Sequence, residues 1–431
     1  MFFSASTNRA YHWIKVISKF ASVQIIAQGL NLISGLFIIR LLSKDEYSYY
    51  TIANTMVSMM NVLVSSGISI SMTSIGGKIW KDQYKFSQLI ITATQLRKYL
   101  AAIIIVAVVP VLIYMLYSNG APSYYSILIT IALLWGLYYE LTAGIQIIIL
   151  RLHSEIARIQ NMELWTSFIR TSLILLCYFT YLNSLIAILI GSLALAIRQL
   201  WLSNWTNSYI TAEAGTNIEY QQDIIRIIKH QFPSTLYYCF QAQIMIWLIG
   251  VFGKAENIAE VGALGRISVI YAIIGSVLNS IILPKFASCQ EPRQLLQKYF
   301  QIILLYLSFC LSLLIASAFF PDQFLWVLGN KYAHLQKELV LISLSTVLSN
   351  VVGVMWSLNA TRGWVKNSWF YIPITLLLQV FLLIYMDVSS LNGAILFGLI
   401  SVIPYFCINI FLTVKGFFTF FKDSIVKVEK V

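Results

Sequence analysis

Amide side chains recur at helical spacing in two apolar segments near the N-terminus. The first segment carries Gln24, Gln28 and Asn31, and the second carries Asn54 and Asn61. Because residues three, four and seven positions apart share one face of a helix, each set would form a polar row on its segment. Such a row either bonds neighbouring helices to one another or lines a hydrophilic cavity. The sequence leaves both interpretations open.

Two segments in the later part of the chain carry comparable polar residues. Gln241 stands in one of them and Asn279 in the other, with further amide or hydroxyl groups close by in sequence. Inside lipid an unpaired polar group is costly, so these side chains should face other helices or water. Polar residues on both pairs of segments favour a central hydrophilic cavity.

Ionisable side chains inside apolar segments are a third feature. Glu140, Arg170, Arg198 and Arg266 lie within or close to such segments. A charge at the centre of a bilayer costs about 2.5–3.5 kcal/mol on insertion scales, so each needs a partner or water. With a helical rise of about 1.5 Å per residue, Glu140 and Arg170 fall about 10–14 Å from the cytoplasmic ends of their segments. We therefore predict a Glu140–Arg170 ion pair, and we keep Glu140 as a candidate proton-coupling carboxylate.

Arg266 and Arg40 lie near the opposite, outer ends of their segments. An arginine at such a place commonly extends its guanidinium to the membrane interface. Facing inward, the same side chains would instead give a cavity positive potential and attract an anionic headgroup. The sequence is compatible with both orientations.

The elements that must position these side chains are membrane-spanning helices. Of 431 residues, 59% are hydrophobic and only 11% are charged, whereas a soluble domain has about 25% charged residues. That composition excludes a soluble enzyme and a disordered chain. Because one span needs about 20 mostly apolar residues, we predict about twelve spans. They lie at residues 18–40, 48–70, 98–118, 124–149, 163–183, 184–203, 233–252, 261–283, 300–320, 338–358, 368–386 and 390–413.

A polar stretch divides these segments into two halves. We predict an N-terminal half at 1–203, a cytoplasmic linker with an interfacial helix at 204–232, a C-terminal half at 233–413 and a basic tail at 414–431. Each half begins with a span, a short turn containing Lys-x-Glu and a second span. Two similar halves in parallel orientation are a known transporter plan. The predicted fold class is an all-α polytopic membrane protein, with two pseudo-symmetric six-helix bundles around a central cavity.

Lysine and arginine predict how the chain is oriented. With the N-terminus in the cytoplasm, most of the 29 Lys and Arg residues fall on the cytoplasmic side, as the positive-inside rule requires. The exceptions in the outer loops are Arg40, Lys44, Lys254, Lys331 and Lys337. Both termini are therefore expected in the cytoplasm. The net charge of +12 then reflects topology and anionic lipid headgroups, and we expect no nucleic-acid partner.

Motifs for enzymatic chemistry are missing from the sequence. The 5 cysteines show neither disulfide nor metal-binding spacing, and no nucleophile elbow, zinc-binding histidine pair or dinucleotide-binding glycine motif occurs. The outer loops are too short to form a catalytic domain. We therefore expect no catalytic residue, no metal and no cofactor. Transport is the function class that remains.

Three stretches resemble signatures of one transporter family. They are residues 36–60, LFIIRLLSKDEYSYYTIANTMVSMM; residues 327–345, VLGNKYAHLQKELVLISLS; and residues 359–368, NATRGWVKNS. By these turns and spans the chain resembles the polysaccharide flippase (O-antigen transporter) family of the multidrug/oligosaccharidyl-lipid/polysaccharide exporter superfamily. The sequence departs from the pattern at Ser48, where the family often has glycine. The motifs are structural turns, so they identify no substrate residues.

The resemblance implies a flippase that moves an undecaprenyl-pyrophosphate-linked oligosaccharide across a bacterial inner membrane by alternating access. The product would enter O-antigen, lipopolysaccharide or another surface polysaccharide. Implied partners are the lipid-linked substrate, membrane lipids and the polysaccharide polymerase machinery. Amides would bond the sugars, and arginines would balance the diphosphate. The candidate substrate-binding residues are Gln24, Gln28, Asn31, Asn54, Asn61, Arg170, Arg266, Gln241 and Asn279, with Glu140 as the coupling candidate.

Three alternatives stay open at this point. A multidrug or cation antiporter of the same superfamily would share the twelve spans but needs a dedicated cavity carboxylate, for which Glu140 is the candidate. A lipid II flippase is a second alternative, but that group resembles proteins with fourteen spans, two more than we predict here. A scaffold for a glycan assembly complex would have a sealed interior. A cavity with net positive potential would favour the oligosaccharide flippase, and an uncharged or acidic one the antiporter.

Overall fold

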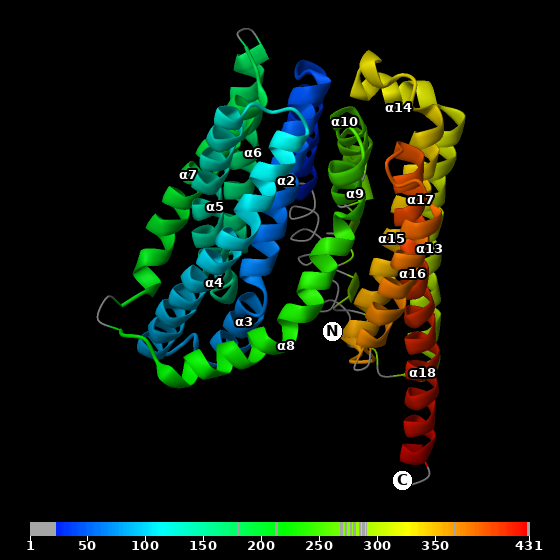
Figure 1. Cartoon of the computed structure of the whole chain (residues 1–431). Coiled ribbons are helices and arrows are strands. Elements are labelled where there is room, and N and C mark those ends of the chain that lie inside the picture. The colour runs from blue at the N-terminus through cyan, green and yellow to red at the C-terminus, as the bar shows by residue number, and fades with distance from the viewer. Residues whose placement is uncertain are drawn as a thin grey trace, which may run out of the picture. The chain divides into compact units, whose positions relative to one another are not determined.

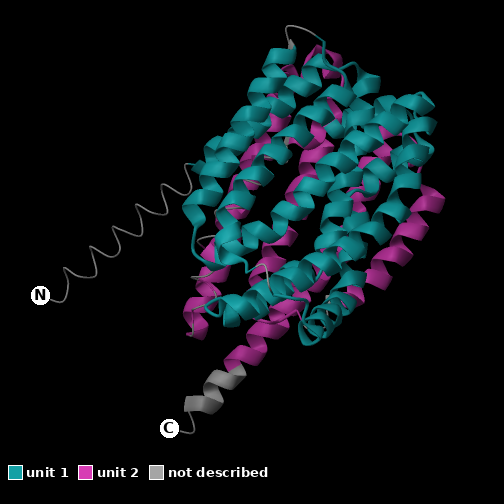
Figure 2. Ribbon diagram, turned by 90° about the vertical axis from the view of Figure 1, so that its left-hand side faces the viewer, with its two compact units in different colours: residues 1–262 teal, residues 263–431 magenta. Residues whose placement is uncertain are grey.

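Helices make up all the regular structure in the described part of the chain (Figure 1). The computed structural model describes residues 23–178, 181–211, 214–267, 270–271, 274–275, 278, 282–283, 286, 289, 291–365 and 368–428. The chain forms two compact units, residues 1–262 and 263–431 (Figure 2). The division expected from the sequence, at residues 203 and 233, stays a prediction.

The helices have the lengths and composition of membrane spans. Among the described residues, eight helices are long and apolar enough to cross a bilayer, and a bent pair, α8 (Ile218–Ala242) with α9 (Ile244–Phe252), makes a ninth. The predicted span at 163–183 overlaps α6 (Ile156–Tyr178), which is less apolar, and the one at 368–386 overlaps the shorter α16 (Tyr371–Tyr385). The span predicted at 261–283 falls partly outside the described residues. The prediction of an all-α, multi-pass membrane protein is confirmed.

The first unit is built from a helix at Val23–Leu41 and the helices that follow it. These are α2 (Lys44–Ser65), α3 (Ile68–Ile79), α4 (Gln83–Ser118), α5 (Ser123–Leu152), α6 (Ile156–Tyr178), α7 (Ser184–Thr206), α8 (Ile218–Ala242), α9 (Ile244–Phe252) and the greater part of α10 (Ala255–Leu264). Helix α5 packs along α7, while α2 contacts α4, α5 and α7. Polar side chains begin several of these helices, as the Asp82 carboxylate does by accepting from the Lys85 backbone N–H at 3.1 Å.

Both Lys-x-Glu turns join helices within the first unit. Lys44, at the start of α2, pairs with Glu256 and lies 3.2 Å from the Glu260 carboxylate, both on α10. Glu46 accepts hydrogen bonds from the Ser184 backbone N–H at 2.7 Å and from the Tyr125 hydroxyl at 2.9 Å. This carboxylate therefore satisfies an exposed donor at the start of α7. The repeated turn predicted from the sequence thus holds α2 to α5, α7 and α10.

Helix α8 packs its apolar face on protein. The sequence suggests a short helix lying in the membrane interface, but α8 continues through Pro233 to Ala242, and a 61° bend separates it from α9. Ile224 is fully buried in a cluster with Ile68, Met72 and residues of α4 and α5. The face expected to meet lipid is therefore partly covered by α3, α4 and α5.

A glycine allows the close approach of α8. Gly67, at the break between α2 and α3, has φ +74°, and a Cβ there would lie 2.7 Å from the Ile228 Cα. Both the left-handed backbone and the contact require glycine.

The second unit contains α13 (Pro292–Phe319), α14 (Pro321–Leu328), α15 (Gln336–Thr361), α16 (Tyr371–Tyr385), α17 (Leu391–Ser401) and α18 (Ile403–Val428). Helix α15 packs against α13, α17 and α18. The fully buried Asn359 accepts from the Thr413 hydroxyl at 3.0 Å and donates to the Asn409 carbonyl at 3.2 Å. This polar contact fixes the end of α15, where one of the family-like turns begins.

We expect Gly67→Ala to lower the free energy of unfolding by about 1–2 kcal/mol from left-handed strain alone, with a further loss from the contact with Ile228. Thermal unfolding of the detergent-solubilised protein measures the change. Gly77→Ala is the control, because Gly77 is exposed on α3 with open space around it, and alanine favours a helix interior. Equal behaviour of the two variants would contradict the role of Gly67.

Candidate functional site

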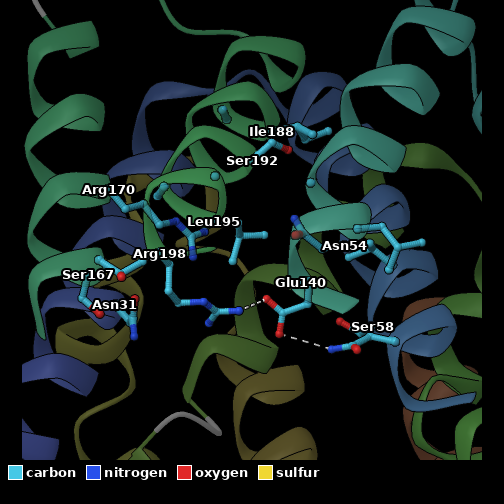
Figure 3. A pocket seen from close by; sticks show the side chains of 18 of the residues that line it. Asn31, Asn54, Ser58, Glu140, Ser167, Arg170, Ile188, Ser192, Leu195 and Arg198 are labelled. Carbon is cyan, nitrogen blue, oxygen red and sulfur yellow. Dashed lines mark hydrogen bonds and ion pairs between the residues drawn. The ribbon is translucent and has the colours of Figure 1, made fainter. Parts of the chain in front are cut away.

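A cavity of about 460 Å³ lies inside the first unit, among the Val23–Leu41 helix, α2, α5, α6 and α7. Its polar lining comes from all five helices (Figure 3). The polar and charged residues that line it are Gln24, Gln28, Asn31, Tyr50, Asn54, Ser58, Asn61, Glu140, Glu163, Thr166, Ser167, Arg170, Ser192 and Arg198. The two amide rows predicted near the N-terminus both face this cavity.

Small residues bring α5 and α7 close together at one wall. The Ser192 hydroxyl on α7 donates to the Ala132 carbonyl on α5 at 2.9 Å, and a Cβ on Gly136 would lie 3.0 Å from the Ser192 Cβ. Close approach of helices through small residues is a common means of association in membranes. Glu140 follows Gly136 by one turn on α5, and Arg198 lies on α7 with Ser192; both charged residues line the cavity beside this contact.

Glu140 and Arg198 form an ion pair across the cavity wall (Figure 3). The Glu140 carboxylate also accepts from the Asn61 amide at 3.4 Å. The Arg198 side chain is 14% exposed and that of Glu140 is 29% exposed, so the pair is only partly desolvated and stays open to the cavity. The sequence prediction of a Glu140–Arg170 pair is therefore wrong in its partner. Packing of α5 on α7 places Arg198 nearer than Arg170.

Arg170 lies in the cavity on α6 and donates to the Tyr50 hydroxyl at 3.0 Å. The Nε atoms of Arg170 and Arg198 are buried and have no hydrogen-bond partner within the described structure. The Thr171 hydroxyl, beside Arg170, donates to the Leu30 carbonyl at 3.1 Å and joins α6 to the first helix. Two arginines therefore line one cavity and, among the described residues, each keeps a buried Nε–H without a partner beside it.

Several lining residues escape prediction from the sequence. Glu163 does not stand out because it lies at the cytoplasmic start of its predicted span, and Arg198 stands out only as an ionisable residue. A signal for each exists: Glu163 and Arg170 are seven residues apart on one helix, as are Gly191 and Arg198. With these residues the lining has two arginines and two glutamates, and its formal charges balance.

The other predicted residues lie elsewhere. Gln241 is near the end of α8, and Arg266 lies in the short turn Gly265–Ile267 of the second unit. Neither lines this cavity. Asn279 is outside the described residues. Binding by these three therefore stays a prediction.

Comparison with known proteins places the chain in a family. A family model described as polysaccharide biosynthesis protein matches residues 37–337. The chain belongs to the polysaccharide biosynthesis protein family. The resemblance drawn from residues 36–60 and 327–345 is confirmed at this level. Among curated proteins, none matches the sequence significantly.

Solved structures similar to this polysaccharide biosynthesis family member include MATE proteins. An inward-facing multidrug resistance MATE family transporter of the MOP superfamily is 16% identical with a TM-score of 0.72, over 95% of this chain and 99% of that one. A MATE protein in complex with MaL6 is 15% identical with a TM-score of 0.64, over 97% of both chains. An outward-facing MATE transporter is 16% identical with a TM-score of 0.60, over 96% of both. These likenesses establish the fold.

We expect Gly136→Ala to destabilise the protein by about 1–3 kcal/mol, because overpacking a close helix contact forces α5 away from α7. The same shift would disturb the Glu140–Arg198 pair. Gly191→Ala is the matched control, since Gly191 lies on the facing helix and lines the same cavity with open space at its Cβ position. Thermal unfolding in detergent distinguishes the two. A Gly136→Ala protein as stable as Gly191→Ala would show that this contact is not close in solution.

Proposed function

We propose that the chain is a flippase for an undecaprenyl-pyrophosphate-linked oligosaccharide, which it moves across a bacterial inner membrane by alternating access. The observation that carries the proposal is the cavity in the first unit, which is lined by amides from two helices and by two arginines, Arg170 and Arg198. A sugar headgroup bears many hydroxyl groups and a diphosphate, neither of which crosses hydrocarbon unassisted. The polyprenyl tail can stay in lipid.

The cavity chemistry supports recognition of both parts of such a headgroup. The amides of Gln24, Gln28 and Asn31 can donate to and accept from sugar hydroxyls. The guanidinium groups of Arg170 and Arg198 can donate charge-assisted bonds to the diphosphate. A volume of about 460 Å³ lies within the range of small-molecule sites, so the diphosphate and its first sugar are the parts we place here.

The cellular setting of the proposal follows from the family and the charges. A member of a polysaccharide biosynthesis family would deliver its product to O-antigen, lipopolysaccharide or another surface polysaccharide. Membrane lipids and the polysaccharide polymerase machinery are the partners that this role requires. The distribution of Lys and Arg supports both termini in the cytoplasm. Transport rather than catalysis is the activity that we assign.

One observation favours a second function. Glu140 and Glu163 both line the cavity and balance the charges of the arginines. A cavity carboxylate that exchanges a proton or cation is what a multidrug or cation antiporter requires, and the similar solved structures include multidrug resistance transporters. The flippase requires the arginines for binding an anion, whereas the antiporter requires a carboxylate for exchanging a proton or cation.

The amide rows give the first test. Gln28→Leu and Asn61→Leu remove sugar-binding amides while keeping similar side-chain size, so each is expected to lower surface-glycan export several-fold and to cause lipid-linked oligosaccharide to accumulate. Gln95→Leu is the control, because Gln95 is exposed on α4 and does not line the cavity. Membrane levels of each variant are measured in parallel. Normal export by both cavity variants would mean that the rows only pack helices.

The charged residues give the second test, with farnesyl diphosphate as a short polyprenyl diphosphate. Arg170→Met is expected to weaken the binding of farnesyl diphosphate to the purified protein roughly 10- to 100-fold. A hydrogen bond to a charged group contributes about 1.5–3 kcal/mol. Arg158→Met, a change in an arginine of α6 that is exposed and paired with Glu155, should leave binding unchanged. Loss of transport in Glu163→Gln or Glu140→Gln, with Arg170→Met fully active, would support the antiporter instead.

A further inference from the structure

Arg97 is a buried cation next to the cavity. The sequence assigns it to the cytoplasmic set of basic residues, but it lies well inside α4 and is only 5% exposed. Its Nη2 donates to the Ser65 hydroxyl on α2 at 2.7 Å. A Cβ on Gly144 of α5 would lie 2.7 Å from the Arg97 Nη1. The guanidinium is therefore held between α2 and α5.

The position of Gly144 connects Arg97 with Glu140. Gly144 follows Glu140 by four residues, so the two lie one turn apart on the same face of α5. Glycine at this point leaves room for the guanidinium directly beside the turn that carries the carboxylate. A larger residue would displace the Arg97 guanidinium from this position.

Hydrogen bonds form a second connection between the two charges. From Arg97 the path runs to the Ser65 hydroxyl at 2.7 Å and from Ser65 to the Asn61 amide oxygen at 3.5 Å. The Asn61 amide nitrogen then lies 3.4 Å from the Glu140 carboxylate. Glu140 thus stands between two arginines, in direct contact with Arg198 and joined to Arg97 through two polar side chains.

Arg97 also keeps donors in reserve. Its Nε and Nη1 are buried and have no hydrogen-bond partner in the described part of the protein. No carboxylate there lies within ion-pair distance of Arg97. Burying an arginine without a counter-ion is unfavourable, so a cation in this place favours any state in which a negative charge approaches it.

We propose that Arg97 is the reserve counter-ion of Glu140, a positioning residue that lets Arg198 leave its ion pair and bind an anionic headgroup. This inference rests on the proposed function. When the diphosphate draws Arg198 away, the Glu140 carboxylate turns towards Arg97 on the side where Asn61 and Ser65 connect the two. The carboxylate then keeps a cation, and the exchange of partners makes binding of the anion favourable. Without Arg97, binding of the diphosphate to Arg198 would deprive Glu140 of its counter-ion.

A double-mutant cycle on farnesyl diphosphate binding tests this role. Arg97→Gln is expected to weaken binding about tenfold, because Glu140 would lose its second partner. Glu140→Gln removes the carboxylate that competes for Arg198, so its affinity should equal or exceed that of the wild-type protein. In the Glu140→Gln background, Arg97→Gln should have no further effect. Arg97→Lys keeps the positive charge and should restore most of the affinity.

The controls separate this role from a structural one. Lys98→Gln removes the neighbouring, exposed cation of α4 and should leave binding unchanged. An Arg97→Gln effect that persists in the Glu140→Gln background, or is absent from the wild-type background, overturns the role of Arg97 alone. If Arg97→Gln does not fold, a loss of affinity in Glu140→Gln likewise overturns that role. A wild-type protein that binds farnesyl diphosphate no better than neutral farnesol overturns the proposed function, and this inference with it.

Discussion

Compensation of charge inside an apolar bundle is the constraint on which the first unit depends. Glu140 lies on a helix whose neighbours are mostly aliphatic, and an ionised carboxylate there is stable only with cations and donors around it. Arg198 supplies the direct partner and Asn61 a hydrogen bond. The amides and hydroxyls around this pair line the same cavity and give it further hydrogen-bonding groups. The cavity and the charges therefore stabilise one another.

Close helix packing makes that compensation possible. Gly136 and Ser192 allow α5 and α7 to approach, and Gly144 allows the Arg97 guanidinium to lie against α5. Each of these small residues stands within about two helical turns of a charged group. Helices in lipid associate through packing and polar contacts, because lipid provides no hydrophobic driving force between them. The same small residues thus hold the bundle together and direct its charged side chains inward.

The turns at the ends of the helices serve the same unit from outside the cavity. Lys44 and Glu46 belong to one short turn but contact different helices. Lys44 contacts α10, and Glu46 contacts the start of α7. Both contacts give a charged or donor group a partner within the first unit. They also fix α2, which carries Asn54 and Asn61 into the cavity. A sequence motif that appeared only as a repeat is therefore part of the scaffold of the site.

The sequence by itself determined the fold class and the polar rows, because both depend on local patterns. Apolar segments of span length specify membrane helices, and residues such as Gln24, Gln28 and Asn31 share a face whatever the helix packs against. It did not determine the partner of Glu140 or the surroundings of Arg97. The depth of a residue along its helix does not reveal which neighbouring helix it faces. A basic residue near a predicted loop also looks the same in the sequence whether its helix begins before or after that residue. Only the tertiary structure decided these points, since α4 begins at Gln83 and the contact of α5 with α7 selects Arg198 over Arg170.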